Sequence, residues 1–166
     1  NLRSMVRDSA DSRMVLDLTT VAVRAAQDAA RSLSAEERLE VTDVGEPVMV
    51  WGSVGPLELA IGNLVRNAIE ASPPDCDVVF SIEQGAEWAE IRVEDSGPGI
   101  PEEIGEKVFE PFFTTKTERG GTGLGLAITR DMIAQLGGEI GLENMEHGGA
   151  RATIRLQRWQ ETEPSS

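Results

Sequence analysis

Two asparagines on one predicted helix are the first residues whose type and spacing could do chemistry. Asn63 and Asn67 lie four positions apart, with Glu70 three further on, so all three share one face of a helix predicted over residues 54–71. The amide oxygen of Asn67 suits a hard cation, because magnesium takes a few protein oxygens together with substrate phosphates. Taken alone, the same pattern also fits a solvated polar face, which is common on helices.

Two glycine-rich segments could bind the rest of a phosphorylated ligand. Asp95 follows a predicted strand and precedes Gly97 and Gly99, so its carboxylate could accept a hydrogen bond from an adenine amino group while the glycines admit the ring. An ordinary turn has the same composition. Residues 120–125 open a helix, where unpaired amides and the positive end of the helix dipole attract phosphate, although a flexible hinge would suit them equally. Their spacing matches neither a dinucleotide fingerprint nor a P-loop.

A cluster of aromatic residues separates these two segments. Residues 108–116 contain three of the four phenylalanines of the chain, within a long stretch rich in glycine and proline. We interpret the cluster as core, as a movable hydrophobic plug or as a docking patch. Lys116 and Arg119 are the local cations that a triphosphate would need in so acidic a chain.

Hydrophobic periodicity predicts the elements that must position these residues. Three segments repeat apolar residues at helical spacing, and others alternate apolar and polar residues as half-buried strands do. Helices are predicted over 20–33, 54–71 and 122–136, and strands over 15–18, 40–44, 48–51, 78–83, 88–94, 139–143 and 151–156. The second and third strands are expected to flank a turn at 45–47. Strands in one sheet with helices on a single face predict an α+β fold, a two-layer sandwich.

Composition limits the class of protein. A length of 166 residues fits one domain, and a net charge of -14 with a pI near 4.4 argues against nucleic acid and anionic membranes as partners. Cys76 is the single cysteine, which excludes an internal disulfide and a Cys-rich metal site and favours the cytoplasm. No apolar run approaches the ~20 residues of a membrane span, and residues 1–5 lack a signal-peptide pattern. An anchor of the parent protein could lie outside this chain.

The order of the motifs resembles that of the catalytic, ATP-binding domain of two-component sensor histidine kinases, in the GHKL superfamily. Residues 63–68 are similar to the N box of this family and residues 95–99 to its first glycine box. Residues 109–113 are similar to the F box and residues 121–125 to the second glycine box. The resemblance spans roughly residues 16–156 and implies the Bergerat ATP-binding fold, with a mixed sheet. Residues 110–116 most resemble the nitrogen-regulation and oxygen-sensor branch.

The resemblance also implies roles for individual residues. Asn67 is expected to hold Mg2+ and Asp95 to bind the adenine amino group, within a site closed by an ATP lid over about 97–121. The residues implied in catalysis are Asn63, Asn67 and Lys116. The residues implied in binding ATP are Asn63, Arg66, Asn67, Asp95, Gly97, Gly99, Ile100, Phe112, Thr115, Lys116, Gly121, Thr122, Gly123, Leu124, Gly125 and Leu126.

Domain organisation and partners follow from the same resemblance. Residues 1–14 are expected to end a helix of a preceding dimerisation domain, 15–157 to form the catalytic domain and 158–166 a polar tail. The γ-phosphoryl group would pass to a histidine on that separate helical domain, and a response regulator would act downstream. One alternative is a non-catalytic switch, in which ATP orders the lid to control partner docking. A serine kinase acting on a partner protein is a third hypothesis, which the F box disfavours.

The chain departs from the family pattern at several positions. Glu70 stands where many members have a basic residue, so a phosphate contact is missing or moved to Arg66. Ala150, after Gly149, stands where many have threonine near the adenine. The single histidine, His147, lies in a polar loop and is interpreted as a surface residue, so the acceptor must come from elsewhere. ATP-hydrolysing relatives carry a catalytic glutamate at the position of Asn63. Because asparagine cannot act as a general base, its presence favours phosphoryl transfer to a protein over hydrolysis.

Overall fold

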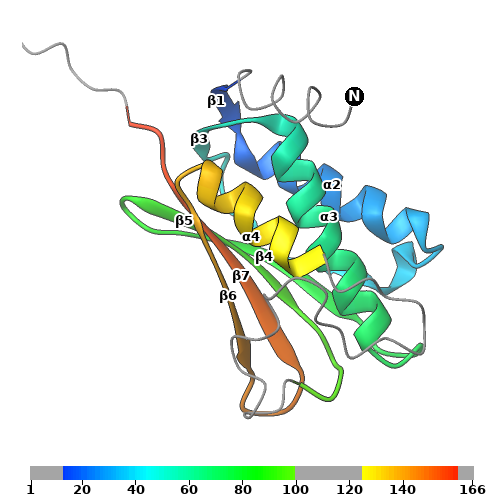
Figure 1. Ribbon diagram of the computed structural model, residues 1–166. Coiled ribbons are helices and arrows are strands. Elements are labelled where there is room, and N and C mark those ends of the chain that lie inside the picture. Colours follow the sequence, from blue (N-terminus) through cyan, green and yellow to red (C-terminus); the bar gives the residue numbers. More distant parts are fainter. Residues whose placement is uncertain (1–12, 100–124, 161–166) are drawn as a thin grey trace, which may run out of the picture.

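The main body is a five-stranded sheet with a layer of helices on one face (Figure 1). The computed structural model describes residues 13–99 and 125–160. The sheet follows the order β2-β4-β5-β7-β6, in which β2 is parallel to β4 and the other neighbours are antiparallel. Its strands are β2 (Leu39–Val41), β4 (Val78–Gln84), β5 (Trp88–Glu94), β6 (Glu139–Asn144) and β7 (Ala150–Gln157). The mixed sheet implied by the family resemblance is therefore present, and the strands predicted over 78–83 and 88–94 are neighbours in it.

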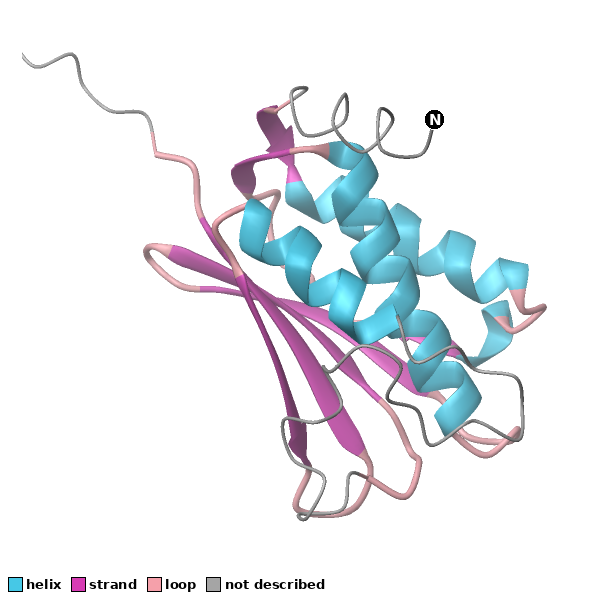
Figure 2. Ribbon diagram, in the orientation of Figure 1, coloured by secondary structure: helices cyan, strands magenta, loops and turns pink. Residues whose placement is uncertain are grey.

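Three helices cover one face of this sheet, as Figure 2 shows. They are α2 (Leu18–Ser32), α3 (Val54–Ala71) and α4 (Gly125–Gln135), and a short 3-10 turn, η1 (Glu36–Arg38), follows α2. Alternate residues of the central strands point at the helices and are almost fully buried, among them Phe80, Ile91 and Ile154. The α+β two-layer sandwich is the predicted one.

One strand pairing differs from the sequence-based prediction. Residues 40–44 and 48–51 do not flank a hairpin turn: β2 pairs with β4, whereas β3 (Met49–Gly52) pairs antiparallel with β1 (Met14–Asp17) in a separate two-stranded sheet. Positive φ angles at Asp43 and Gly45 turn the chain out of the main sheet after β2. Val48 then accepts a backbone hydrogen bond from Leu18 (2.8 Å), which brings β3 to the start of α2.

The helix boundaries are close to those predicted. Ser53 occupies the position before α3, but its side chain does not cap an amide of the first turn. Asp17 caps α2, because its carboxylate accepts hydrogen bonds from the backbone and hydroxyl of Thr20. Gly137, with φ +78°, ends α4, and Gly138 donates to the carbonyl of Ile133 at 2.9 Å.

Arg38 caps the C-terminal end of α3, a contact that the sequence analysis did not identify. Its Nη2 donates to the carbonyl oxygens of Ile69 (3.1 Å), Ser72 (3.2 Å) and Pro73 (2.9 Å), and its Nε donates to that of Cys76 (3.1 Å). The last carbonyls of a helix lack intrahelical donors, and a guanidinium supplies several in a fixed plane. Arg38 thereby joins the β2 edge of the sheet to the end of the helix that carries the asparagines.

The chain enters and leaves this body beside β3. Arg158 and Trp159, which the sequence assigns to a polar tail, donate backbone hydrogen bonds to Glu87 and Met49 (both 2.8 Å). Val50 also bridges to Arg158, so β3 lies between β1 and the C-terminal segment. The domain boundaries stay a prediction, with the end of a helix over 1–14 and a tail from 158.

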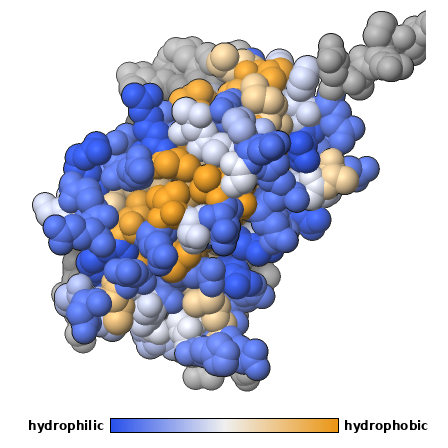
Figure 3. Space-filling model, turned by 180° about the vertical axis from the view of Figure 1, so that it is seen from behind, coloured by the Kyte–Doolittle hydropathy of each residue, from blue (hydrophilic) through white to orange (hydrophobic). Residues whose placement is uncertain are grey.

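The surface is mainly hydrophilic, with apolar areas between charged side chains on the face seen in Figure 3. On the side of the sheet away from the helices, arginines and glutamates form ion pairs, one within β5 and the others between neighbouring strands. These are Arg92 with Glu83 and Glu90, Arg151 with Glu94 and Glu143, and Arg155 with Glu90. No helix within residues 13–99 and 125–160 is long and apolar enough to cross a membrane.

Candidate nucleotide site

Asp95 is held at the end of β5 by the backbone of β7. Its amide donates to the carbonyl of Ala150 at 2.9 Å, and its Oδ1 accepts from the amides of Ala150 and Gly97, both at 3.0 Å. These bonds fix the half-buried carboxylate in one orientation. Within the described part of the chain no hydrogen bond reaches the second oxygen, Oδ2. One carboxylate oxygen is therefore positioned by the protein and the other remains available to accept from a ligand.

Three glycines around Asp95 leave no room for a side chain, Gly97 and Gly149 against the backbone and Gly99 against the side chain of Asn144. A Cβ at Gly149, where φ is +82°, would overlap the carbonyl oxygen of Asp95. A Cβ at Gly97 would lie 2.6 Å from the carbonyl oxygen of Ala71, and one at Gly99 2.7 Å from Oδ1 of Asn144. The first glycine box thus packs on the last turn of α3 and on the β6–β7 connection, and side chains at these positions would push the loop away.

The Asp95 loop and the asparagines meet along α3. The amide of Ser96 donates to Oγ of Ser72 at 2.9 Å, directly after the helix, and Asn67 lies one helical turn before Ala71. Asn67 is half-buried, and its carboxamide has no hydrogen-bond partner within residues 13–99 and 125–160. The structure therefore places this carboxamide near the Asp95 loop, and its binding of magnesium stays a prediction.

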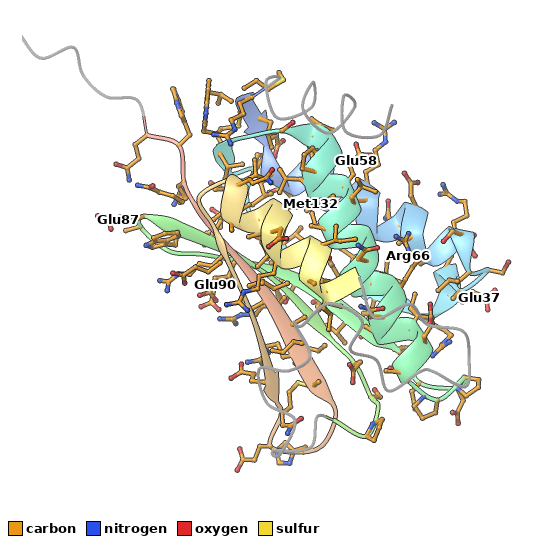
Figure 4. All side chains as sticks on the ribbon, viewed as in Figure 1. Glu37, Glu58, Arg66, Glu87, Glu90 and Met132 are labelled. Carbon is orange, nitrogen blue, oxygen red and sulfur yellow. The ribbon has the colours of Figure 1, made fainter. Side chains whose placement is uncertain are left out.

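Asn63 is already engaged. Its Nδ2 donates to Oγ1 of Thr129 on α4 at 3.2 Å, and its Oδ1 accepts from Nη2 of Arg66 at 2.8 Å. Arg66, labelled on α3 in Figure 4, folds back over Gly62, where an added Cβ would lie 3.3 Å from its Nη1. The glycine inside the helix is thus explained by packing: it leaves room for the guanidinium beside Asn63.

Helix α4 brings the start of its first turn to the middle of α3. Gly125 is its first described residue, and the half-buried Leu126 packs on the hydrophobic core. Thr129, four residues beyond Gly125, is fully buried and contacts Asn63. The helix N-terminus that follows the second glycine segment therefore lies next to the N box, in the arrangement that a phosphate site needs.

Part of the predicted site falls outside the described residues. Of the predicted lid over 97–121, only the first three positions are described. The phenylalanine cluster and Arg119 also lie outside the described residues. The predicted binding residues concerned are Ile100, Phe112, Thr115, Lys116, Gly121, Thr122, Gly123 and Leu124. Among the described residues, the structure gathers Asn63, Arg66, Asn67, Asp95, Gly97, Gly99, Gly125 and Leu126 along α3 and its neighbours.

Two contributions were missed by the sequence analysis. Thr129 was treated only as part of an apolar helix, and its role as partner of Asn63 has no signal in local spacing because the two residues are 66 positions apart. Ala150 acts through its backbone, which orients Asp95 whatever its side chain is. His147 is exposed in the β6–β7 connection, as predicted.

The chemistry of these groups is that of ligand positioning. Within the described ranges, no three His, Cys, Asp or Glu side chains are grouped as a metal site would require. A cation here would rely on the Asn67 amide and on oxygens of the ligand, which is how magnesium is commonly bound with phosphates. Asn63 has no basic atom with which to activate water.

Comparison with known proteins identifies the family. The model for histidine kinase-, DNA gyrase B- and HSP90-like ATPases matches residues 52–160. The sensor histidine kinase GtrS of Pseudomonas aeruginosa is 38% identical over 133 residues, covering 80% of this chain and 27% of that protein. The sensor protein CreC of Escherichia coli is 32% identical over 154 residues, covering 89% of this chain and 32% of that protein. This chain spans about a third or less of either relative.

Similar solved structures indicate the same family. The mycobacterial sensor histidine kinase MprB has a TM-score of 0.76 at 30% identity, over 88% of this chain and 97% of that one. A nucleotide-free catalytic domain of the histidine kinase ThkA has a TM-score of 0.76 at 31% identity, over 89% and 98%. The chain belongs to the histidine kinase-, DNA gyrase B- and HSP90-like ATPase family. Within it, the chain is a histidine kinase ATPase domain with the Bergerat fold, which confirms the predicted class; the finer branch stays a prediction.

Proposed function

We propose that this chain binds Mg-ATP between Asp95, the α3 asparagines and the start of α4, and donates the γ-phosphoryl group to a histidine on a separate dimerisation domain. The observation that carries the proposal is the carboxylate of Asp95. Two backbone amides hold its Oδ1, and its Oδ2 has no partner within the described residues. A carboxylate fixed in this way accepts an exocyclic amino group without losing side-chain entropy on binding.

The residues present fit magnesium as well as the nucleotide. The half-buried Asn67 amide has no partner among the described groups and can offer its oxygen to a hard cation. When bound, Mg-ATP supplies the phosphoryl group and a cation that neutralises its developing charge. The chain itself contributes positioning: Asn63 and Arg66 provide donors at the phosphate end, and the α4 N-terminus provides amides.

Transfer rather than hydrolysis is favoured by Asn63. Its carboxamide is bonded to Thr129 and Arg66 and cannot take a proton from water. The acceptor must therefore be another protein group, and the relatives are about three times longer than this chain or more, which leaves room for an acceptor domain. We also assign a dimerisation and phosphoacceptor domain and a response regulator to the system of the parent protein because of its family, and a cytoplasmic setting because of the single cysteine.

Replacement of Asn67 by alanine tests the proposal. Asn67→Ala removes the oxygen proposed to hold magnesium, so we expect Mg-dependent ATP affinity to fall more than about tenfold, which is roughly 1.4 kcal/mol. The measurement is calorimetric titration of the 166-residue chain with ATP, with and without Mg2+. Autophosphorylation of the parent protein should be lost in parallel.

The exposed Glu58 on the same helix provides the control (Figure 4). Glu58→Ala changes the charge of α3 away from the asparagines and should leave both affinity and autophosphorylation unchanged. Full autophosphorylation by Asn67→Ala would rule out the assignment of the cation to Asn67. Absence of any ATP binding by the wild-type chain would reject the function itself.

A further inference from the structure

We propose that Thr129 is a positioning residue for phosphotransfer, because its hydroxyl fixes the carboxamide of Asn63 so that one amide N–H is directed to the phosphates. The proposal rests on the proposed function and extends it to a residue in α4. Thr129 is fully buried, and its Oγ1 accepts from Nδ2 of Asn63 at 3.2 Å. A buried hydroxyl between two helices is costly unless it is hydrogen-bonded, so this contact has a defined geometry.

The two bonds on Asn63 select one of its two amide orientations. The amide nitrogen of Asn63 donates a hydrogen bond to Thr129, and Arg66 donates one to the amide oxygen of Asn63 at 2.8 Å. A carboxamide nitrogen carries two hydrogens, so one remains after the bond to Thr129. Phosphate oxygens only accept at neutral pH, and they therefore need this nitrogen rather than the oxygen. Without the hydroxyl, rotation of the amide by half a turn would present an acceptor to an anion.

Thr129 also keeps the two halves of the site at a constant separation. It stands four residues beyond Gly125, about one turn from the end of α4 that follows the second glycine segment. Its bond to Asn63 joins that turn to the N box of α3. Donors from α3 and amides from α4 must contact one triphosphate together, and preorganised donors lose nothing to rearrangement when charge develops.

A purely structural role would give a different pattern of mutant effects. Thr129→Val keeps the shape and removes the hydroxyl, whereas Thr129→Ser keeps the hydroxyl and removes a methyl group. If the hydroxyl positions Asn63, serine restores function and valine does not. If Thr129 only fills the space between the helices, the serine variant, which creates the cavity, is the more impaired.

The experiment measures kcat and KM for ATP in autophosphorylation of the parent protein, together with thermal unfolding of each variant. We expect Thr129→Val to lower kcat/KM about 10- to 100-fold, within the range caused by small misplacements of reacting groups. Thr129→Ser should stay within about threefold of wild type. Thr153→Val, which removes a hydroxyl from the open face of the sheet, is the matched control and should have wild-type kinetics.

A double-mutant cycle decides whether Thr129 acts through Asn63. In an Asn63→Ala background, Thr129→Val should cause no further loss, because the group that it positions is gone. Wild-type kcat/KM for Thr129→Val, equal defects in the valine and serine variants, or additive losses in the cycle would each overturn the proposal. These outcomes leave wild-type ATP binding intact, so they are distinct from failure of the proposed function, in which the wild-type chain would not bind ATP.

Discussion

At the scale of single residues, the geometry around Asp95 depends on the small size of its neighbours Gly149 and Ala150. Asp95 pairs with Ala150 across the β5–β7 ladder, and the ladder continues only because Gly149 has no Cβ. Backbone amides hold one oxygen of the carboxylate, and no described group donates a hydrogen bond to the other. Two neighbours with the smallest side chains therefore orient the residue proposed to recognise the base.

Gly149→Ala is predicted to damage both stability and ligand binding. The new Cβ would overlap the carbonyl oxygen of Asp95, and alanine is strained at φ +82°. We expect a loss of about 2 to 4 kcal/mol in the free energy of unfolding, together with weaker ATP binding. Thermal unfolding and ATP titration measure the two effects.

Gly141→Ala is the matched control for that substitution. Gly141 lies in β6 and has no atom within 4 Å of an added Cβ. Alanine should therefore be accepted there with a change below about 0.5 kcal/mol. Equal losses at positions 141 and 149 would contradict the explanation by close backbone approach.

At the scale of elements, α3 links the parts of the site. The Asp95 loop packs on its last turn, Asn67 lies one turn earlier, and Asn63 contacts α4. Its C-terminal end is held by Arg38 rather than by a glycine cap. The position of this end affects the Asp95 loop directly, since the amide of Ser96 donates to Ser72.

Arg38→Ala is predicted to destabilise the end of α3. It removes donors from carbonyls of Ile69, Ser72, Pro73 and Cys76, at a cost of about 2 kcal/mol for hydrogen bonds to a charged group. Hydrogen exchange should rise in the last turn of α3 and in the Asp95 loop, while chemical denaturation reports the total loss.

A surface arginine supplies the comparison for Arg38. Arg31 pairs with Asp28 at 3.0 Å, but both side chains are more than half exposed. Ion pairs of this kind contribute about 0 to 1 kcal/mol, so Arg31→Ala should have little effect. A larger loss from Arg31→Ala than from Arg38→Ala would contradict the role given to the Arg38 cap.

Local patterns predicted most of these elements, and distant contacts account for what they missed. The alternation in residues 78–83 and 88–94 and the apolar stripe of residues 54–71 gave β4, β5 and α3 nearly to the residue. The prediction that residues 40–44 and 48–51 flank a turn as adjacent strands was wrong, because two short strands separated by a turn resemble a hairpin locally, whereas β3 pairs with β1. Partner choice was decided by contacts such as that of Leu18 with Val48, which no spacing rule contains.

The site was predictable to the same degree. Asn67 and Asp95 belong to short motifs, so a role could be predicted for each from the sequence, and these roles stay predictions. Thr129 and Arg38 instead contact partners more than thirty positions away. The residue types of Thr129 and Arg38 do not indicate these contacts. Thr129 lies in a helix with many apolar residues, and an arginine in an acidic, exposed turn is usually solvated.

At the scale of the whole molecule, β3 connects the two ends of the described chain. It pairs with β1 on one side, and Trp159 donates to the carbonyl of Met49 on the other. Arg158 donates to Glu87, immediately before β5. The C-terminal segment therefore stabilises the body beyond the end of β7.

Truncation tests this contribution. A chain ending at Gln157 loses both backbone hydrogen bonds, so we expect about 2 kcal/mol of destabilisation and a fall in Tm of about 5 °C. A chain ending at Gln160 retains those bonds and should have the same Tm as the full chain. Equal melting temperatures for the two truncations would show that the segment adds nothing.

The position of β3 has a practical consequence. Glu87 precedes β5 and Asp95 follows it, so the seven-residue strand, roughly 20 Å long, separates the place where the chain leaves from the carboxylate (Figure 1). Arg13 directly precedes β1, which pairs with β3, and Gln160 directly follows Trp159, which bonds to β3. Attachment to a bead, a sensor chip or a fused reporter at either residue would leave the opposite side open to solutes. Fusion of the domain to other proteins through this side should therefore leave the proposed ligand site accessible.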